Sequence, residues 1–275
     1  MNEFTTVLSN CTITKVQDDL NHYYFVDGEY YVSLTHILEV GAPFPEGLKT
    51  WLRVTDGEAS QERFEMTGAR GTKLHKALED LSLGMELYAE DFPTTYEKDA
   101  ITTFIRCMQF LFPQGKYPKE THLEAIVADT NLKVGGTMDF VSVADLRRLE
   151  LLCNATYSLD LDKNGRFVPK KPLEGKEKPV KFVKDYKFTG KSSYNHKVQV
   201  SKYKYMFNRC YINEQPATKA YIWRYSPQHK FGFQMQEASF REKSFNRIYE
   251  TALDYLGGYP KPPQIKVYAD KFSLF

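Results

Sequence analysis

Two apolar segments near the middle of the 275-residue chain constrain its fold more than any other feature. Residues 122–128 and 132–143 have the composition of β-strands, and the short polar turn Asp129-Thr130-Asn131 separates them. The other elements predicted around them are helices at residues 62–83, 95–111 and 195–211 and a strand at residues 180–188. This order of helices and strands predicts an α/β (α+β) fold, with a mixed central β-sheet flanked by helices.

Hairpins and short helices are predicted on either side of this central region. Residues 22–38 form a hairpin around Asp27-Gly28, a strong turn signal, and lead into a short helix at 35–38. The remaining predicted elements are a helix at 48–54, a second hairpin from strands 218–225 and 232–236, and a helix at 241–256. The domains expected are an N-terminal hairpin and helical lobe (1–60), a core (61–256) with a Lys-rich insertion at about 145–179, and a peripheral tail (257–275).

Charge and cysteine usage exclude several classes of protein. The four cysteines are widely spaced and form no C-x-x-C pair, which argues against clustered zinc and iron–sulfur sites. No apolar run is long enough to span a membrane, and the N-terminus resembles neither a secretory signal nor a transit peptide, so a cytoplasmic location is expected. The net charge is only +2, but residues 163–191 contain ten Lys/Arg against three Asp/Glu. Such a stretch can neutralise phosphates, or it can be an ordinary solvated loop.

Acidic side chains in the predicted strands are the first candidates for chemistry. Asp185 and Lys187 are two residues apart on one strand and therefore share a face. The carboxylate can hold a hard cation, and the ammonium can position water or offset charge on a phosphate. Asp139 lies in an apolar strand, where a buried carboxylate needs a partner or a metal, and pairing of the two central strands brings Glu124 toward it. A solvated ion pair and an edge-strand acid facing water are the alternative interpretations.

Two predicted helices carry polar pairs at a spacing of four residues, which places both members of each pair on one face. His75 and Glu79 form the first pair, and a neutral imidazole can ligate Mg²⁺ or Mn²⁺ beside carboxylates. Gln199 and Tyr203 form the second pair, in which the amide can orient the lysine or a phosphate and the phenol can stack on a base. Each pair taken alone also fits an ordinary helix surface.

The order of these residues along the chain is more specific than any one of them. The motifs are G-T-x-x-H-x-x-x-E at residues 71–79, G-x-x-D at 136–139, D-Y-K at 185–187 and Q-x-x-x-Y at 199–203. In this order they resemble the RecB-like branch of the PD-(D/E)XK nucleases. Residues 31–38 are similar to the S-V-T-x-I-L opening of phage and mitochondrial-genome-maintenance exonucleases of that group. The resemblance spans roughly residues 22–207.

The resemblance implies a restriction-endonuclease-like core and a DNA exonuclease that uses one or two Mg²⁺ or Mn²⁺ ions. The metal ligands that it implies are the side chains of His75, Asp139 and Asp185 and the carbonyl of Tyr186. Lys187 would be the catalytic lysine, and Glu124 an accessory acid that holds a second metal or a water. The residues implied to support the site or to contact DNA are Thr72, Glu79, Lys191, Gln199 and Tyr203.

The chain departs from the family pattern in two ways. The segment between Asp139 and Asp185 is longer than the usual short turn, which is why the Lys-rich stretch reads as an insertion. The cysteine cluster of iron–sulfur relatives is missing, so no cluster is expected. No helicase P-loop is present either, which predicts a stand-alone nuclease or a subunit of a larger machine that includes a replication or recombination protein. The compact chain and the absence of a transit peptide favour a bacterial or phage-infected cell.

Three alternatives to an exonuclease follow from the same residues. One is an endonuclease of the same fold, because the chemistry would be identical. Another is a catalytically silent nuclease-fold module that binds DNA or a protein partner, although the motif residues expected to be lost in such a module are all present. The last is an unrelated α/β protein with accidental motifs. Trp51, Tyr30 and Tyr31 are candidates for stacking on unpaired bases of single strands or duplex ends, with core packing as the alternative for each.

Overall fold

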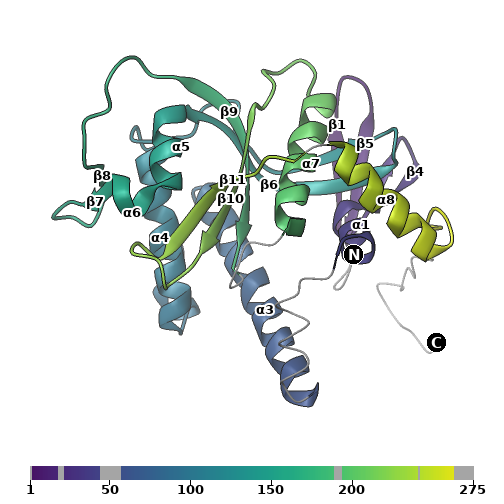
Figure 1. Ribbon diagram of the computed structural model, residues 1–275, viewed down its shortest axis with the longest axis horizontal. Coiled ribbons are helices and arrows are strands. Elements are labelled where there is room, and N and C mark those ends of the chain that lie inside the picture. The colour runs from purple at the N-terminus through teal and green to yellow at the C-terminus, as the bar shows by residue number, and fades with distance from the viewer. Residues whose placement is uncertain (1, 18–21, 44–56, 189–193, 241, 263–275) are drawn as a thin grey trace, which may run out of the picture.

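A mixed β-sheet runs through the protein and positions every other element (Figure 1). The structure is a computed structural model that describes residues 2–17, 22–43, 57–188, 194–240 and 242–262, with only the backbone described for 57–65. Nine strands of the described chain join the sheet in the order β1-β2-β3-β4-β6-β9-β10-β11, and β5 pairs with β6. These strands are β1 (Asn2–Val7), β2 (Thr12–Gln17), β3 (His22–Val26), β4 (Glu29–Ser33), β5 (His122–Asp129), β6 (Val134–Asp145), β9 (Pro179–Lys187), β10 (Lys219–Tyr225) and β11 (Phe233–Glu237).

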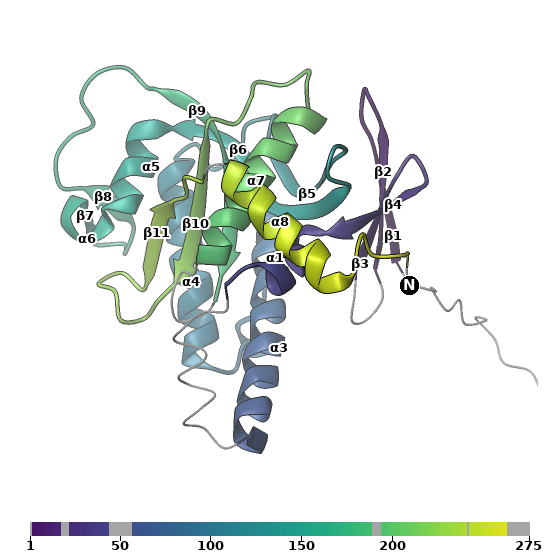
Figure 2. The same cartoon turned by 45° about the vertical axis from the view of Figure 1, so that its right-hand side comes forward.

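Helices cover both faces of this sheet (Figures 1 and 2). The helices are α1 (Leu34–Gly41), α3 (Gly57–Ser82), α4 (Thr95–Leu111), α5 (Leu146–Cys153), α6 (Ala155–Ser158), α7 (Tyr194–Cys210) and α8 (Glu242–Leu256), with a 3-10 turn η1 (Ala89–Asp91). Helices α3, α4 and α5 pack on one face around Phe104 and Phe140, and α1, α7 and α8 pack on the other around Phe207 and Phe245. The predicted mixed α/β class, with a large mixed central sheet flanked by helices, is therefore confirmed.

Local sequence explains where several of these elements begin and end. Asp27 and Gly28 both have positive φ, 49° and 84°, as a two-residue turn between twisted antiparallel strands requires. The Thr94 hydroxyl accepts a hydrogen bond from the Glu97 backbone N–H, and the Glu97 carboxylate accepts one from the Thr94 N–H, so a capping box starts α4. Asp145 ends β6 and caps α5 by accepting a hydrogen bond from the backbone N–H of Arg147.

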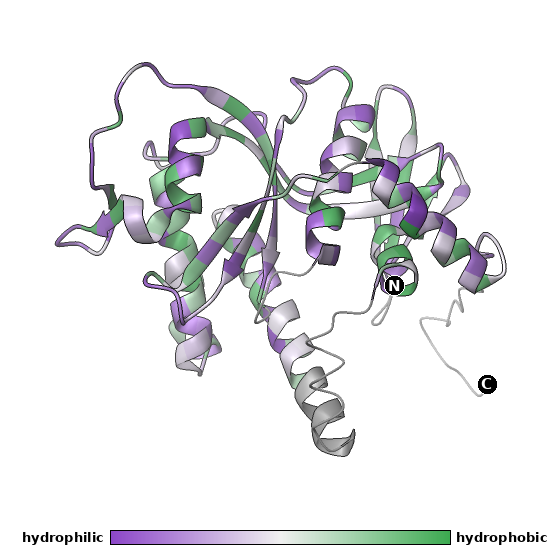
Figure 3. Cartoon of the chain, viewed as in Figure 1, coloured by the Kyte–Doolittle hydropathy of each residue, from purple (hydrophilic) through white to green (hydrophobic). Residues whose placement is uncertain are grey.

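The structure differs from the sequence prediction in the predicted insertion and at the N-terminus. Residues 146–153, unassigned from sequence, form α5, and the predicted loop at 157–179 contains the ribbon β7 (Leu159–Leu161) and β8 (Phe167–Pro169). The ribbon is anchored because Phe167 is buried against Phe231 and Phe233. The connection from β8 to β9 is strongly hydrophilic, as Figure 3 shows. The unpredicted hairpin β1–β2 extends the central sheet through β3 and β4.

A narrow seam joins these four N-terminal strands to the rest of the sheet. Strand β4 pairs in parallel with β6 at only two positions, Val32 with Val134 and Ser33 with Gly135. Tyr259 reinforces the seam, since its hydroxyl accepts a hydrogen bond from the backbone N–H of Val32 at 3.0 Å and reaches the Lys133 carbonyl at 2.6 Å. Residues from 257 onward were expected to form a peripheral tail, and Tyr259 of this segment contacts the sheet. Residues 263–275 and the predicted helix at 48–54 lie outside the described residues.

No helix in the described part of the chain is long and apolar enough to cross a membrane.

Candidate active site

A fork between strands creates the opening of the candidate site. On the edge of β6 that faces away from β5, β4 pairs with Val134 and Gly135, whereas β9 pairs from Phe140 to Asp145. None of the described strands pairs with residues 136–139 on that edge, because β9 leaves β6 after Lys184 and continues beside β10. The polar side chains of both strands therefore meet at the point where the sheet opens.

Asp139 and Asp185 face each other across this fork. The backbone N–H of Tyr186 donates a 2.6 Å hydrogen bond to Oδ2 of Asp139, so a side chain replaces the ladder hydrogen bond that the diverging strands have lost. Lys187 Nζ lies 2.7 Å from Oδ2 of Asp185, and both side chains are largely buried. Apart from this ion pair, no hydrogen-bond partner for the buried oxygen is found among the described residues.

Glu124 reaches the same region through a distortion of β5. Leu123 pairs with Phe140 and Ala125 with Met138, so Glu124 stands opposite Asp139. Its φ is +49°, a left-handed conformation that strains a residue other than glycine by about 1–2 kcal/mol. Local distortions of this kind re-aim side chains beside functional sites. The backbone thus interrupts regular pairing at the one position that brings a third carboxyl group to the fork.

His75 closes the fork from α3. Its Nδ1 lies 3.6 Å from Oδ2 of Asp139, and its ring meets Phe188 edge-on with a centroid distance of 5.1 Å. Burial, followed by the positive charge of Lys187, lowers the pKa of His75 to about 4. The imidazole is therefore neutral near pH 7, which is the form that binds metals. Glu79, one turn further along α3, forms an ion pair with Lys76 at 3.1 Å.

The carboxyl groups of the fork are electrostatically crowded. Burial and the neighbouring charge of Asp139 raise the pKa of Glu124 to about 8. Burial also raises the pKa of Asp185 to about 6, against the opposing effect of Lys187, and it raises the pKa of Asp139. Lys187 remains protonated, because Asp185 and Asp139 outweigh its burial and raise its pKa. A divalent cation would offset the mutual repulsion of these carboxylates.

The donor set fits a hard divalent cation that is coordinated mainly by oxygen. Asp139 and Asp185 would hold it together with the neutral imidazole of His75, while Glu124 would reach it directly or through water. Within the described ranges, however, no three His, Cys, Asp or Glu side chains already stand at metal-binding spacing. The predicted ligands are thus gathered at one fork without forming a finished coordination shell.

The other predicted residues fall into three groups. Gln199 and Tyr203 lie on α7, where the amide of Gln199 donates to the Tyr203 hydroxyl at 3.3 Å. Tyr203 is 3% exposed and packs against Gly136, so it supports the fork from the core rather than presenting a surface to DNA. Thr72 is exposed on α3 and donates a hydrogen bond to the Gly68 carbonyl of its own helix. Lys191 lies outside the described residues.

The aromatic candidates of the N-terminal region do not line the fork. Tyr31 is 4% exposed in the core, and Tyr30 packs against Phe25 and Tyr259. These positions agree with core packing, the alternative interpretation. Trp51 lies outside the described residues.

Two features beside the fork were missed by sequence reasoning. The Tyr24 hydroxyl shares a 2.9 Å hydrogen bond with Thr137, on the unpaired stretch of β6. A hollow of about 280 Å³ adjoins Phe188 and is lined by Arg70, Tyr96 and Tyr225, among others. The Arg70 guanidinium lies 4.1 Å from the centroid of the Tyr96 ring. Four separate segments of the chain build this hollow, so no local pattern could have indicated it.

Comparison with known proteins gives little further information. No family model and no curated protein matches the sequence. The crystal structure of SSO0001 is similar over 66% of this chain and 84% of its own, with 13% identity and a TM-score of 0.28. At this TM-score the similarity has no bearing on the interpretation of the fork.

Proposed function

We propose that the protein is a Mg²⁺- or Mn²⁺-dependent DNA nuclease of the PD-(D/E)XK type, similar to the RecB-like exonucleases. One observation carries the proposal: the fork between β6 and β9 gathers Asp139, Asp185 and Lys187 around the imidazole of His75. These are four of the residues to which the motif order assigns the chemistry. Exonuclease action is preferred over endonuclease action because of the motif order and the similarity of residues 31–38 to known exonucleases.

The side chains of the fork suit phosphodiester hydrolysis. Bound metal would lower the pKa of a coordinated water and neutralise charge on the scissile phosphate. Lys187, kept protonated by Asp185 and Asp139, orients that water and offsets the charge that develops on the phosphate oxygens. The N–H of Tyr186 fixes the Asp139 carboxylate through its 2.6 Å hydrogen bond. His75 stays neutral near pH 7, so its unprotonated ring nitrogen can bind a metal.

The hollow beside Phe188 gives the substrate a place next to these groups. Arg70 offers a guanidinium to a phosphate, and the partly exposed Tyr96 offers a ring edge to a base, with the buried Tyr225 packed behind it. The Tyr96 hydroxyl donates to the Phe188 carbonyl at 3.0 Å, which ties this hollow to the end of β9. We therefore assign the hollow to the nucleotide that flanks the scissile bond.

The test is cleavage of end-labelled linear single-stranded, linear duplex and circular single-stranded DNA, with Mg²⁺, Mn²⁺ or EDTA. Metal-dependent loss of linear DNA but not of circular DNA is the expected result. Lys187→Ala should abolish cleavage, whereas Lys197→Ala, which changes an exposed lysine on α7, should leave it intact. Cutting of the circle would replace the exonuclease by an endonuclease. No cleavage with either metal would refute the proposal and favour a silent module that binds DNA or a partner.

A further inference from the structure

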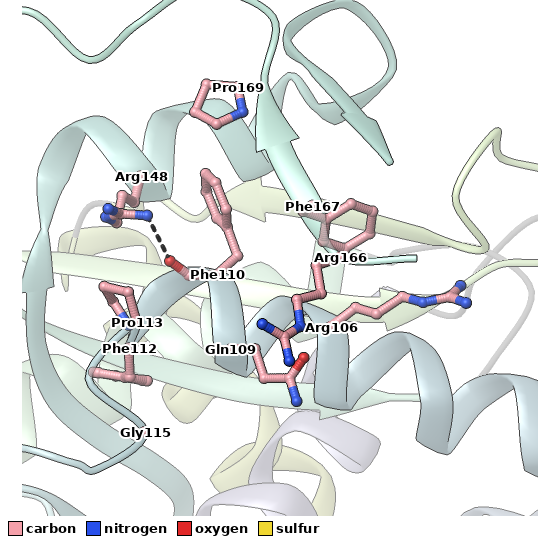
Figure 4. Close-up of a pocket in the computed structure, with 10 residues that line it drawn as sticks. All are labelled: Arg106, Gln109, Phe110, Phe112, Pro113, Gly115, Arg148, Arg166, Phe167 and Pro169. Atoms are coloured by element: carbon pink, nitrogen blue, oxygen red, sulfur yellow. Dashed lines mark hydrogen bonds between the residues drawn. The ribbon is translucent and has the colours of Figure 1, made fainter. Parts of the chain in front are cut away.

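A second hollow lies beside the C-terminal end of α4, away from the fork. It has a volume of about 360 Å³ and is lined by residues from α4, the turn after it, α5 and the β8 ribbon (Figure 4). None of its lining residues belongs to the fork, and β6 connects the two regions, with Asp139 at the fork and Asp145 just before α5. Six residues of extended strand span about 20 Å. The hollow is therefore a separate surface and not part of the candidate active site.

Three arginines surround this hollow. Arg148 comes from α5 on one side of Phe110, and Arg106 and Arg166 lie on the other side, as Figure 4 shows. In the described part of the chain, none of the three forms an ion pair with a carboxylate. Arg148 instead donates to the Phe110 carbonyl at 2.9 Å. Guanidinium groups bind phosphates and carboxylates through paired hydrogen bonds, so the hollow is built for an anionic ligand.

The rest of the lining is apolar and largely aromatic. Phe110, Phe112 and Phe167 are largely buried and form its floor with ring edges, and Pro113 and Pro169 contribute apolar edges. The Arg148 guanidinium lies 5.2 Å from the centroid of the Phe110 ring, so cationic and aromatic surfaces meet in one place. A ligand that satisfies both needs an anionic group and a flat apolar group close together. A nucleotide has both, as phosphate and base.

The surroundings favour a polyanionic chain over a single nucleotide. Residues 163–178 next to the hollow contain six Lys/Arg against two Asp/Glu. This row of cations suits a polymer that carries one negative charge on every unit. We propose that the arginine hollow, formed by Arg106, Arg148, Arg166 and the rings between them, is a second binding site for single-stranded nucleic acid. The inference rests on the proposed function only in taking DNA as the polymer.

The distance between the two sites adds a length dependence. A stacked strand advances about 3.4 Å per nucleotide, so bridging the 20 Å between the fork and the end of β6 takes about six nucleotides. Oligonucleotides longer than this can engage both sites, and trinucleotides can engage only one. Affinity should therefore rise steeply with length between three and about twelve nucleotides.

Binding is best measured without cleavage, by fluorescence anisotropy of labelled oligodeoxythymidylates with the Lys187→Ala protein in Mg²⁺, which keeps the metal at the fork. The double variant Arg106→Ala/Arg166→Ala should weaken binding of a 15-mer by about tenfold or more and make its salt dependence shallower. The matched control is Arg247→Ala, an exposed arginine on α8 across the sheet, which should bind like the parent. Thermal unfolding followed by circular dichroism checks that each variant is folded.

Three outcomes would overturn the inference. The first is undiminished oligonucleotide binding by the double variant, and the second is an equal loss of binding with Arg247→Ala. The third is arginine-dependent binding of a labelled glutamate decapeptide in place of the oligonucleotide, which would assign the hollow to an acidic peptide. Failure of the proposed function would appear in the cleavage assay instead. Arginine-dependent binding without cleavage supports the hollow and refutes the nuclease, and cleavage without arginine-dependent binding does the reverse.

Discussion

Replacement of Lys184 by methionine should stabilise the protein. Lys184 lies on β9 between Val183 and Asp185, but its side chain points to the opposite face, toward α4. It is 1% exposed, with Nζ 3.1 Å from Sδ of Met108 and 4.7 Å from the centroid of the Phe140 ring. No carboxylate of the described residues forms an ion pair with it. The ammonium is therefore held by a sulfur atom and aromatic rings alone.

The size of the effect follows from the pKa of this lysine. Burial lowers the pKa of Lys184 from 10.5 to about 7, against the opposing effects of Cys107 and Asp139. At about 1.4 kcal/mol per pKa unit, keeping the charged form in this environment costs about 5 kcal/mol. The unfolded chain holds the proton up to about pH 10.5, whereas the folded protein releases it above about pH 7. The unfolded state binds more protons in this window, so the free energy of unfolding rises with pH across it.

Urea unfolding at pH 7 and pH 9.5 measures this directly. The wild-type protein should gain about 3 kcal/mol from Lys184 between these pH values, and Lys184→Met should lack that gain while being the more stable protein at pH 7. Lys219→Met is the matched control, since Lys219 is paired with Glu237 near the surface at 2.8 Å. Parallel pH dependence in the wild type and Lys184→Met, or a loss of stability in the variant at pH 7, would refute the reasoning.

Three further predictions concern the fork and the core. Burial raises the pKa of Asp185 to about 6, so its ionisation removes stability as pH rises through that value. In EDTA above pH 6, Asp185→Asn should therefore raise the free energy of unfolding by at most about 3 kcal/mol. Addition of Mn²⁺ should stabilise only the wild type. Denaturant titrations with and without metal measure both effects. A Cβ added at Gly136 would lie 2.5 Å from Cε1 of Tyr203, so Gly136→Ala should lower the free energy of unfolding by about 1–3 kcal/mol, measured by thermal unfolding. The control Gly71→Ala, where an added Cβ has no neighbour within 4 Å, should stabilise α3. Asp129→Ala removes the 2.6 Å partner of Lys202, which is 3% exposed, and leaves it only Glu242, which is 3.1 Å away and partly exposed. The loss of the buried partner should cost about 1.5–3 kcal/mol, whereas an equal loss from Lys202→Met would contradict a penalty that arises from a poorly paired buried charge.

Sequence reasoning succeeded where the deciding interactions are local. The Asp27-Gly28 turn, the helix at residues 95–111 and the shared face of Asp185 and Lys187 all depend on neighbours a few positions apart. Alternation along β9 also places Lys184 on the opposite face. The alternation does not predict that this face packs against Met108 and Phe140, because burial depends on which helix covers the strand.

The fork itself could not be derived from local pattern. It exists because β4 and β9, about 150 residues apart in the chain, pair with different parts of the same edge of β6. The motif order predicted which residues would meet, but not that Glu124 reaches the fork through a left-handed backbone. The three arginines of the second hollow come from α4, α5 and the β8 ribbon, and α5 and the ribbon were not predicted.

The narrow seam between β4 and β6 has a consequence for how the protein opens. Backbone pairing joins strands β1 to β4 to the remaining sheet at two positions, supported by the hydroxyl of Tyr259, the Tyr24–Thr137 hydrogen bond and the shared core, whereas β5 and β6 pair over almost their whole length. Separation of the four strands would therefore need far less free energy than global unfolding. Hydrogen exchange should show the amides of β2 and β3 opening together as one cooperative unit, ahead of those in β6. Tyr259, near the end of the described chain, thus stabilises the position of its first strands. Tyr259→Phe should speed hydrogen exchange in β2 and β3 while leaving exchange in β6 and β9 unchanged.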